Sequence, residues 1–444
     1  MERKLLINTK NNSFNKTISI DGDKSISIRT LLLGSQAYGK SYIENILLSD
    51  DIISSIKCLK KLGVKISIFK KNCFVNGKGI NGFEYKKNIV LDAGNSGTFA
   101  RLILGLLIKS PYYIKLIGDK SLSQRDFERV ITPLQMMGAK FKVNEKKTLP
   151  LQIIGSSFTN PIQYFEKRGS AQCKSTIMLA ALNSPGQTVI NAKKSRDHTE
   201  NIFKHLGIPV ITKKNKDIDE IKVKGQKAFK SFRYKVPSDP SSCAFFIVLT
   251  LLSKNSELKI KDVNVNQSRI GYIKILNKMG AKIKIKNEKK KYGEKQADIF
   301  VKSQPNLKKI NCPSRLNSNL IDEFLIIFLV AARAKGISTF SNLGELNKKE
   351  SPRLKLGSKL LNQLGIRTKL TKDSIKVFGN PELDLKKTIR IKKYYKDHRI
   401  FMTSVVAACI FGGKWKIDDA DSYKSSFPSF LNILKKLGYK FKLV

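Results

Sequence analysis

The sequence has few acidic residues, few histidines and no long apolar run. Asp and Glu total 35 against 84 Lys and Arg, which gives a formal net charge of +49, and there are only 3 His. No apolar run reaches the roughly 18 residues that a membrane-spanning helix needs. The segment MERKLLINTKNNSF at the N-terminus has no apolar signal core. We therefore expect no membrane span and no secretory leader.

Paired cysteine motifs are also missing. The six cysteines lie at positions 58, 73, 173, 243, 312 and 409, none forms a CxxC pair, and three lie in or beside apolar runs. Zinc sites and disulfide frameworks show closer and more regular cysteine spacings. The sequence thus predicts reduced, buried thiols in a cytoplasmic protein, with no metal site.

The positive charge is spread along the whole chain. Lys far outnumbers Arg, and the densest run, 284–295, predicts a solvated turn between strands. A nucleic-acid-binding protein usually gathers its basic residues into a patch. We therefore expect no specific nucleic-acid partner. A non-catalytic basic protein that binds RNA or acidic surfaces remains the alternative from another functional class.

One short pattern occurs six times: the end of an amphipathic helix, a Gly and an alternating segment. The glycines lie at positions 63, 138, 207, 280, 365 and 438, at intervals of 69 to 85 residues. Gly in the left-handed conformation ends helices, and alternation is typical of strands. The near-constant interval predicts six structural repeats rather than a chance periodicity.

A second series of segments lies between these glycines. Each opens with a polar residue suited to a helix N-cap and continues as a mostly apolar stretch, at 25–37, 95–107, 170–182, 239–252, 319–334 and 397–411. They predict one buried helix for each repeat. Helices layered on strands give an α/β fold, and six repeats exceed one core, so we expect two domains of three repeats.

The stretch GSQAYGKS, residues 34–41, matches the pattern of a phosphate-binding P-loop. A P-loop leads from a strand into the N-terminus of a helix, where backbone N–H groups hold phosphate. Here Gly34 falls inside the first predicted buried helix, Gly39 falls at its end, and a strand-like segment follows. The order is reversed, so we interpret the match as a helix end and set a P-loop ATPase aside.

Polar residues at the N-termini of the buried helices are the candidates for binding and catalysis. Helix N-termini attract anions. In a chain that uses Lys almost everywhere, Arg indicates positions that need its planar fork; the arginines in or beside these clusters are Arg29, Arg101, Arg125, Arg196, Arg353 and Arg399. They predict small ligands with several phosphate and carboxylate groups. Asp322 and Glu350 are candidates for proton transfer among these cations, His398 could orient a neighbour, and His198 is interpreted as structural.

Taken together, the clusters resemble a known enzyme family. The motifs are GDKSISIR, DAGNSGTFAR, GDKSLSQRDF, SAQCKSTIMLA, SRDHTE, VPSDPSSCAFF, LIDE, KKESPR, DHR and SFPSF. In order and spacing they resemble 3-phosphoshikimate 1-carboxyvinyltransferases (EPSP synthases) over nearly the whole chain. SAQ, SRDHTE and SFPSF are similar to the class II branch. The rival is the sister family that uses UDP-N-acetylglucosamine; its usual reactive Cys has no counterpart in residues 110–135.

The resemblance implies the enolpyruvyl transferase fold, an inside-out α/β barrel. Each of two domains would be a pseudo-threefold assembly of three βαβαββ units, one domain at 20–238 and the other at 1–19 with 239–444. The active site would lie in the cleft between the domains. The family is expected to need no cofactor, and we expect a monomer.

The resemblance also implies the reaction and its residues. The enolpyruvyl group of phosphoenolpyruvate (PEP) would pass to the 5-hydroxyl of shikimate 3-phosphate, releasing phosphate, on the route to aromatic amino acids. Catalysis would involve Asp322, Glu350 and Lys24. The shikimate 3-phosphate site would comprise Lys24, Ser25, Arg29, Ser170, Gln172, Arg196, Asp322 and Lys349. The PEP site, which glyphosate occupies in this family, would comprise Lys24, Gly97, Arg125, Gln172, Arg353 and Arg399.

Four positions depart from the family pattern. Asp126 replaces a usual Pro, Pro352 a usual Asp, Asn347 a usual Arg, and Ile28 a usual Asn or His. The charge of Asp126 could weaken the hold of Arg125 on phosphate. Pro352 restricts Ser351 to extended geometry. These differences put substrate affinity in question more than reaction type.

Overall fold

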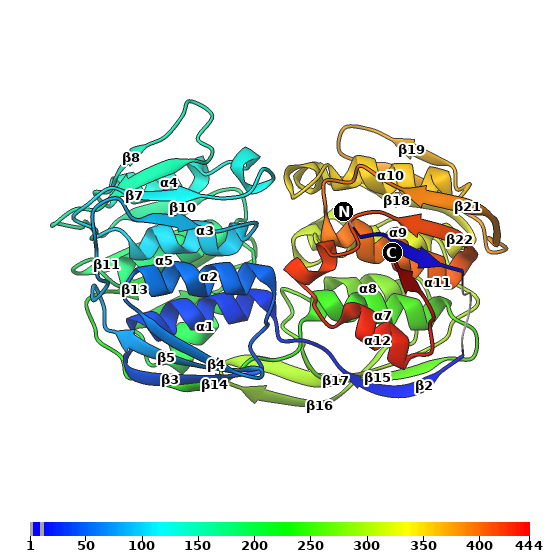
Figure 1. The fold of residues 1–444 in the computed structure, drawn as a ribbon, viewed down its shortest axis with the longest axis horizontal. Helices are drawn as coiled ribbons and strands as arrows, with labels where there is room; N and C mark the ends of the chain where they lie inside the picture. The colour runs from blue at the N-terminus through cyan, green and yellow to red at the C-terminus, as the bar shows by residue number, and fades with distance from the viewer. Residues whose placement is uncertain (1–2, 9–12) are drawn as a thin grey trace. The chain divides into compact units, whose positions relative to one another are not determined.

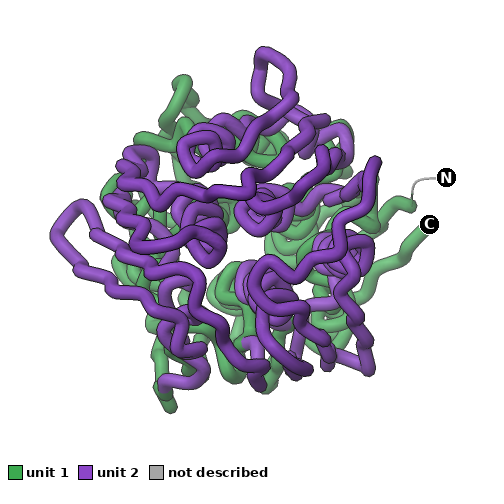
Figure 2. The backbone as a smooth tube through the Cα atoms, turned by 90° about the vertical axis from the view of Figure 1, so that its left-hand side faces the viewer, with its two compact units in different colours: residues 1–21, 237–289, 295–444 green, residues 22–236, 290–294 purple. Residues whose placement is uncertain are grey.

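The computed structural model describes residues 3–8 and 13–444, which divide into two compact units. Unit 1 comprises Met1–Asp21, Pro237–Lys289 and Lys295–Val444, and unit 2 comprises Gly22–Val236 and Lys290–Glu294 (Figure 2). Residues 290–294, which the sequence analysis assigned to the second domain, thus cluster with unit 2. Parts of the expected N-terminal segment, at 1–2 and 9–12, lie outside the described residues.

The glycine pattern correctly predicted the end of one helix in every repeat. All six glycines have positive φ, from 70° to 106°, where the lack of a Cβ removes the steric penalty. The helices that end just before them are α2 Asp50–Lys61, α4 Glu128–Met136, α6 His198–His205, α8 Gly271–Lys278, α10 Arg353–Gln363 and α12 Phe430–Lys436 (Figure 1).

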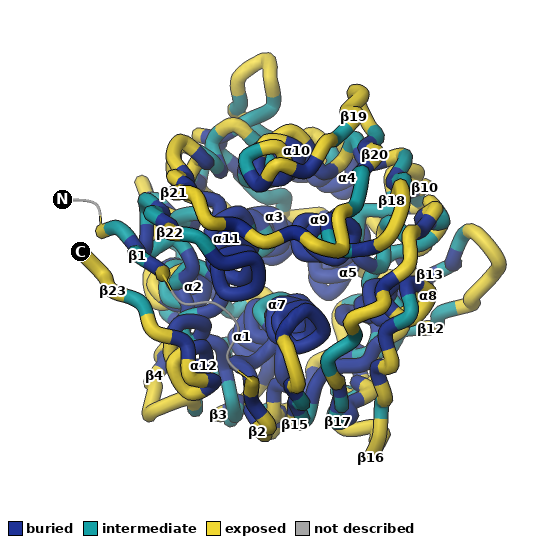
Figure 3. The backbone as a smooth tube through the Cα atoms, turned by 90° about the vertical axis from the view of Figure 1, so that its right-hand side faces the viewer, coloured by how far each residue is buried: buried dark blue, intermediate teal, exposed yellow. Residues whose placement is uncertain are grey.

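The apolar series forms a buried helix in every repeat. These helices are α1 Lys24–Gln36, α3 Gly97–Leu106, α5 Ala171–Ala181, α7 Pro240–Leu252, α9 Phe324–Arg333 and α11 His398–Phe411. Figure 3 shows α7, α9 and α11 as buried backbone within unit 1, and these three helices contact one another. Four of the series carry a side-chain N-cap: Asp23, Ser170, Asp239 and Asp397.

The described strands form six sheets with one recurring order. In unit 2 the sheets are β14 Arg233–Lys235, β3 Tyr38–Glu44, β5 Asn72–Lys78, β4 Lys65–Phe69; β6 Val90–Asp92, β7 Ile114–Ile117, β9 Leu151–Ile154, β8 Lys140–Lys142; and β10 Gln163–Glu166, β11 Gln187–Lys193, β13 Ile218–Lys224, β12 Val210–Lys213. The first pair in each is parallel and the other pairs are antiparallel. The strand after the buried helix always takes the second place.

Unit 1 repeats the same plan. Its sheets are β2 Asn15–Ser19, β15 Glu257–Asn264, β17 Glu294–Lys302, β16 Lys284–Lys291; β18 Gly336–Phe340, β20 Ile375–Gly379, β19 Thr368–Leu370; and β21 Leu385–Ile391, β22 Gly412–Ile417, β1 Leu5–Ile7, β23 Lys442–Leu443. Isolated parallel bridges at Lys308 and Asn311 stand beside β18 where the other sheets have a strand. The six-repeat α/β prediction is therefore confirmed.

Strands from the start of the chain complete sheets of unit 1. β1 pairs with β22 and β23, and β2 pairs in parallel with β15. In unit 2, β14 fills the place beside β3 that β2 would otherwise take. Each unit has its own apolar core. Of the described residues, no helix combines the length and apolar character needed to cross a membrane.

Two local predictions need correction. The basic run 284–295 is not simply a solvated turn, because most of it forms strand β16, and only Tyr292 and Gly293 form the turn into β17. At this turn the buried Glu294 carboxylate contacts His198 Nδ1 at 2.7 Å, within unit 2. Gly39 does not end α1; the helix ends at Gln36, and Gly39 lies in β3 with φ 92°.

Helices α3 and α5 lie in close contact at Gly105. A Cβ there would lie 2.3 Å from the backbone oxygen of Thr176 on α5. We expect Gly105→Ala to lower the free energy of unfolding by about 1–3 kcal/mol through overpacking, measured by calorimetry. Gly344→Ala is the matched control, because its Cβ would meet nothing closer than 3.8 Å. Equal stability of the two variants would contradict this account of the packing.

Candidate active site

The start of α1 places Lys24 and Ser25 at the helix N-terminus in unit 2. The Asp23 side chain caps the helix by accepting from the backbone N–H of Ile26 at 3.0 Å. Lys24 Nζ lies 2.9 Å from the Asp51 carboxylate, and the Lys24 side chain keeps 21% of its surface exposed. The lysine is thus held beside the helix end, and part of its side chain remains exposed to solvent.

Arg29 lies one turn further along α1 and is almost fully buried. Its Nε donates to Thr199 Oγ1 at 2.8 Å, Nη2 to Ser175 Oγ at 3.0 Å, and Nη1 to the backbone oxygen of Ser25 at 3.0 Å. A guanidinium has five N–H donors, and three distinct partners fix its plane here. Arg29 therefore links helices α1, α5 and α6.

The N-terminus of α3 brings Gly97 against Arg125. Arg125 follows the short helix η1 Leu122–Gln124, and its Nη2 donates to Asn95 Oδ1 at 2.9 Å. A Cβ built on Gly97 would lie 2.7 Å from Arg125 Nη1. Arg125 can keep this position only because residue 97 has no side chain.

Arg101 holds Gln172, a role that the sequence analysis missed. Its Nη1 donates to Gln172 Oε1 at 2.6 Å, and Gln172 Nε2 donates to Thr98 Oγ1 at 3.0 Å. The guanidinium also lies over the Phe127 ring at 5.0 Å. The only sequence signal was the presence of Arg rather than Lys beside a polar cluster, which did not identify its partner.

Ser170 and Arg196 precede α5 and α6. Ser170 Oγ accepts from the N–H of Cys173 at 3.2 Å, and the Ser170 N–H donates to the buried Glu166 carboxylate at 2.9 Å. Arg196 is half-buried and lies just before Asp197, the N-cap residue of α6. Ser170 therefore lies at the start of the buried helix α5, whereas Arg196 lies before α6, one of the helices that end at the repeated glycines.

Asp126 does not form an ion pair with Arg125. Its carboxylate lies 3.2 Å from Arg168 Nη1 and 3.6 Å from Arg129 Nε, and it accepts from the N–H of Glu128 at 2.7 Å. The departure from the usual Pro thus supplies a cap at the start of α4, and two other arginines lie close to its charge. Ile28, another departure, is fully buried in the core of unit 2.

In unit 1, one arginine gathers three carboxylates. Arg353 Nε donates to Asp397 Oδ2 at 2.9 Å, Nη1 to Asp322 Oδ1 at 3.3 Å, and Nη2 contacts Glu350. Burial alone would lower the pKa of Arg353, but the three carboxylates raise it above its usual range. Burial raises the pKa of Asp397, yet Arg353 outweighs it, and the pKa is lowered. Arg353 and Asp397 are therefore both charged at neutral pH.

Lys349 and Arg399 complete the cluster around Asp322. Lys349 Nζ lies 3.5 Å from Asp322 Oδ1, and Arg399 Nη1 donates to the backbone oxygen of Asp322 at 2.7 Å. Asp322 was expected to open a helix, but α9 begins at Phe324 with Glu323 as its N-cap residue, so Asp322 lies in the preceding turn. There its side chain can face cations rather than cap a helix.

The start of α10 accommodates the other two departures. Pro352 is the N-cap residue with φ −70°, a value that its ring imposes, and Asn347 Oδ1 accepts from the N–H of Leu354 at 3.2 Å. Asn347 therefore satisfies a donor at the helix start. His398 is buried at the start of α11, beside Asp397, which caps that helix.

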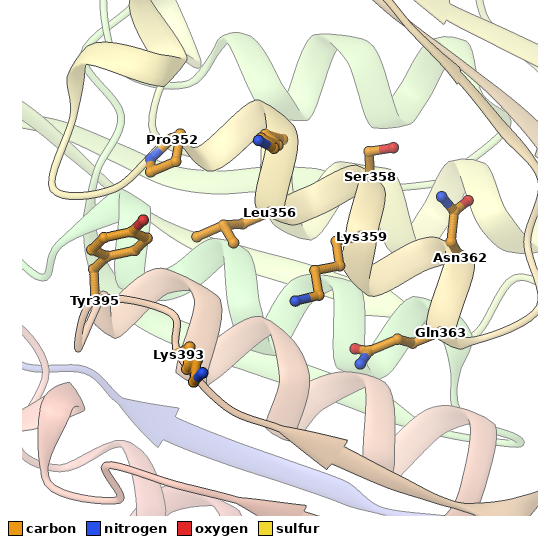
Figure 4. Close-up of a pocket in the computed structure, with 9 residues that line it drawn as sticks. Pro352, Leu356, Ser358, Lys359, Asn362, Gln363, Lys393 and Tyr395 are labelled. Atoms are coloured by element: carbon orange, nitrogen blue, oxygen red, sulfur yellow. The ribbon is translucent and has the colours of Figure 1, made fainter.

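A pocket of about 690 Å³ lies along α10 (Figure 4). Its lining residues are Pro352, Lys355, Leu356, Ser358, Lys359, Asn362, Gln363, Lys393 and Tyr395. Its lining does not include Arg353 or the three carboxylates, but the lining residue Pro352 directly precedes Arg353 in the chain. Because lysine is abundant throughout the chain, the three lysines here do not by themselves indicate a ligand.

Comparisons with known proteins agree on one family. The family model described as EPSP synthase (3-phosphoshikimate 1-carboxyvinyltransferase) matches residues 8–434. The 3-phosphoshikimate 1-carboxyvinyltransferase of Ruthia magnifica subsp. Calyptogena magnifica is 39% identical over 434 residues, covering 98% of each chain. That of Zymomonas mobilis is 36% identical over 443 residues, covering 99% of this chain and 97% of the relative.

Solved structures show the same fold. An EPSP synthase from Acinetobacter baumannii superposes with a TM-score of 0.87 at 32% identity and covers all of both chains. The enolpyruvyl transferase NikO from Streptomyces tendae has a TM-score of 0.78 at 13% identity, which supports the fold alone. Both cover 100% of this chain.

Proposed function

Because this chain belongs to the EPSP synthase family, we propose that it transfers the enolpyruvyl group of PEP to the 5-hydroxyl of shikimate 3-phosphate and releases phosphate. The reaction belongs to the shikimate pathway to aromatic amino acids. The observation that carries the proposal is the cluster around Arg353, where two predicted acid–base residues, Asp322 and Glu350, share one guanidinium. The class II resemblance of SAQ, SRDHTE and SFPSF remains part of the proposal.

Each substrate carries one phosphate and one carboxylate. We assign shikimate 3-phosphate to Lys24, Ser25, Arg29, Ser170, Gln172, Arg196, Asp322 and Lys349, and PEP to Lys24, Gly97, Arg125, Gln172, Arg353 and Arg399. Arg and Lys donors suit these anions. We further propose that the residues of unit 1 and unit 2 act on the same pair of substrates.

The proposed PEP role of Arg353 is constrained by its present partners. Four of its five N–H groups already donate to carboxylates: one from Nε, two from Nη2 and one from Nη1. Within the part of the chain that the structure describes, one N–H of Nη1 is left for a substrate oxygen. Arg353 would then hold the carboxylates and make a single contact with PEP.

The chemistry follows from the charges around the two acids. Protonation of the PEP methylene makes C2 electrophilic, the 5-hydroxyl oxygen bonds to C2, and its proton passes to Asp322. Loss of a methyl proton and of phosphate then restores the double bond. We assign Glu350 to the proton transfers at the methylene carbon of PEP, and Lys24 is a second candidate for this role. Cations beside a carboxylate favour its ionised form, which suits Asp322 as a base.

The test is phosphate release from PEP with and without shikimate 3-phosphate. We expect release only when shikimate 3-phosphate is present. UDP-N-acetylglucosamine serves as the competing acceptor, and release with that acceptor alone would move the chain to the sister activity. Tight binding of a random oligonucleotide at physiological salt, without turnover, would favour the basic binding protein.

Gly97→Ala should weaken the binding of glyphosate more than the binding of PEP. The new Cβ would force Arg125 to move, and a displacement of about 1 Å can cost on the order of 10²-fold. We expect a higher KM for PEP and a larger rise in the glyphosate concentration that halves activity. Gly344→Ala is the control, because Gly344 begins the short helix η3 Gly344–Lys348 and a Cβ there would meet nothing closer than 3.8 Å. An alanine enzyme without added tolerance would contradict the assignment of Gly97 to this site.

We also propose a monomer in the cytoplasm. The state of the thiols supports the cytoplasm, because all six cysteines are free and buried. Burial raises the pKa of Cys58, Cys73 and Cys173 to about 12, so these thiols stay protonated and unreactive. Light scattering during gel filtration tests the assembly state.

A further inference from the structure

A buried ion pair joins the first turns of α5 and α6. Lys174 Nζ lies 2.5 Å from Glu200 Oε1, and the two side chains keep only 1% and 3% of their surface exposed. The pair lies within unit 2, one turn from Ser170, whose backbone oxygen accepts from the Lys174 N–H at 3.2 Å. Its two helices begin at residues that we assign to shikimate 3-phosphate.

Both members lie in positions that local helix energetics does not explain. Asp197 and Glu200 have the spacing of a capping box, in which the glutamate would turn back to the N-cap backbone. Instead Glu200 turns to Lys174, and of the described residues none donates a hydrogen bond to its Oε2. Lys174 is a cation in the first turn of α5, where the helix dipole disfavours positive charge.

The neighbouring residues repeat the same contact. Ser175 Oγ and Thr199 Oγ1 lie 2.7 Å apart, and both accept from Arg29. Two adjacent residues of α5 therefore face two adjacent residues of α6, with α1 joined through the guanidinium. Contacts of this kind fix the distance and rotation between helices, which apolar packing sets less strictly.

We propose that Lys174 and Glu200 are positioning residues for shikimate 3-phosphate, an inference that rests on the proposed function. They hold the first turns of α5 and α6 in one arrangement, so that Ser170 and Gln172 on one helix and Arg196 before the other meet the same ligand. A buried ion pair is often no more stabilising than apolar residues of similar volume. Its value here lies in geometry rather than stability.

The test compares single and double replacements. Lys174→Met and Glu200→Met each leave one buried charge without its partner and should lower Tm. The double variant Lys174→Met/Glu200→Met should regain most of the Tm but keep a KM for shikimate 3-phosphate raised about 10-fold or more, since misplaced binding groups lose affinity steeply. The KM for PEP should change much less. Titration calorimetry with shikimate 3-phosphate alone should show the same loss.

Lys222→Met is the matched control. It removes a half-exposed lysine of unit 2 that pairs with Glu220 at 3.1 Å on β13, and it should leave both KM values unchanged. A double variant with wild-type KM for shikimate 3-phosphate, or with both KM values raised equally, would show a merely structural role and overturn the inference. A wild-type protein without shikimate 3-phosphate-dependent turnover would instead overturn the proposed function, and this inference with it.

Discussion

Asp322→Ala should reduce kcat by about 10²–10⁴-fold, the usual contribution of a positioned acid or base. Asp322 lies among cations, with Lys349 at 3.5 Å and Arg353 at 3.3 Å, and its side chain is 15% exposed. Its carboxylate thus lies beside two cations and keeps enough exposed surface to reach a substrate hydroxyl. The measurement is shikimate 3-phosphate-dependent phosphate release from PEP.

Two further variants separate proton transfer from binding. Asp322→Asn keeps the shape and can still accept hydrogen bonds, but it cannot take a proton, so kcat should fall as in the alanine variant while shikimate 3-phosphate still binds. Asp373→Ala removes an exposed acid of unit 1 and should leave kcat unchanged. Turnover of the Asn variant close to that of the wild type would exclude Asp322 as the base.

Arg353→Met should destabilise unit 1 by about 3–5 kcal/mol, because it removes the guanidinium that pairs with the buried Asp397 carboxylate. Asp397 is only 1% exposed and would keep Ser351 Oγ and the Arg399 N–H as donors, but it would lose the two contacts with Arg353. The single tryptophan, Trp415, is buried in β22. Its fluorescence during urea unfolding therefore reports on unit 1.

The effect should depend on pH in a defined direction. In the wild type the lowered pKa of Asp397 stabilises the fold above about pH 3.9, the pKa of Asp in an unfolded chain, and this contribution is lost as pH falls further. Without Arg353, burial would raise the same pKa, so protonation would favour the folded variant. The stability difference between the two proteins should thus shrink toward low pH.

Arg367→Met is the control for this experiment. Arg367 lies on the surface of unit 1 over the Phe378 ring at 3.9 Å, and its loss should cost about 0.5–1 kcal/mol. A loss of similar size for Arg353→Met, or a difference that does not vary with pH, would contradict the account of the carboxylate cluster.

Local sequence signals predicted the repeated elements well. Glycines such as Gly63 and Gly365 end helices because their positive φ follows from backbone sterics, which act within a few residues. Apolar stretches predicted the buried helices, because the N-cap residue and the apolar run of each helix lie within the same short segment. The strands β1 and β2 carried weaker signals, because each is short and its partners lie more than 200 residues away.

Side-chain partners were harder to predict. Sequence reasoning identified Arg101 and Arg353 as unusual but could not say that one holds Gln172 and the other three carboxylates. Nor did it identify the pair of Lys174 and Glu200, since each looks like an ordinary helix residue. Such contacts depend on how whole helices meet, and that is set by packing across the unit.

The pairing of β1 with β22 and β23 has a consequence for synthesis on the ribosome. Residues 5–7 emerge before nearly all the rest of unit 1, whereas the strands that flank them, β22 and β23, emerge only after residues 412 and 442 are reached. Nearly all of unit 2 has been translated by residue 236, so it can fold during translation. The sheet of β21, β22, β1 and β23 can therefore close only after residue 443 has emerged, and until then β1 lacks its β23 partner.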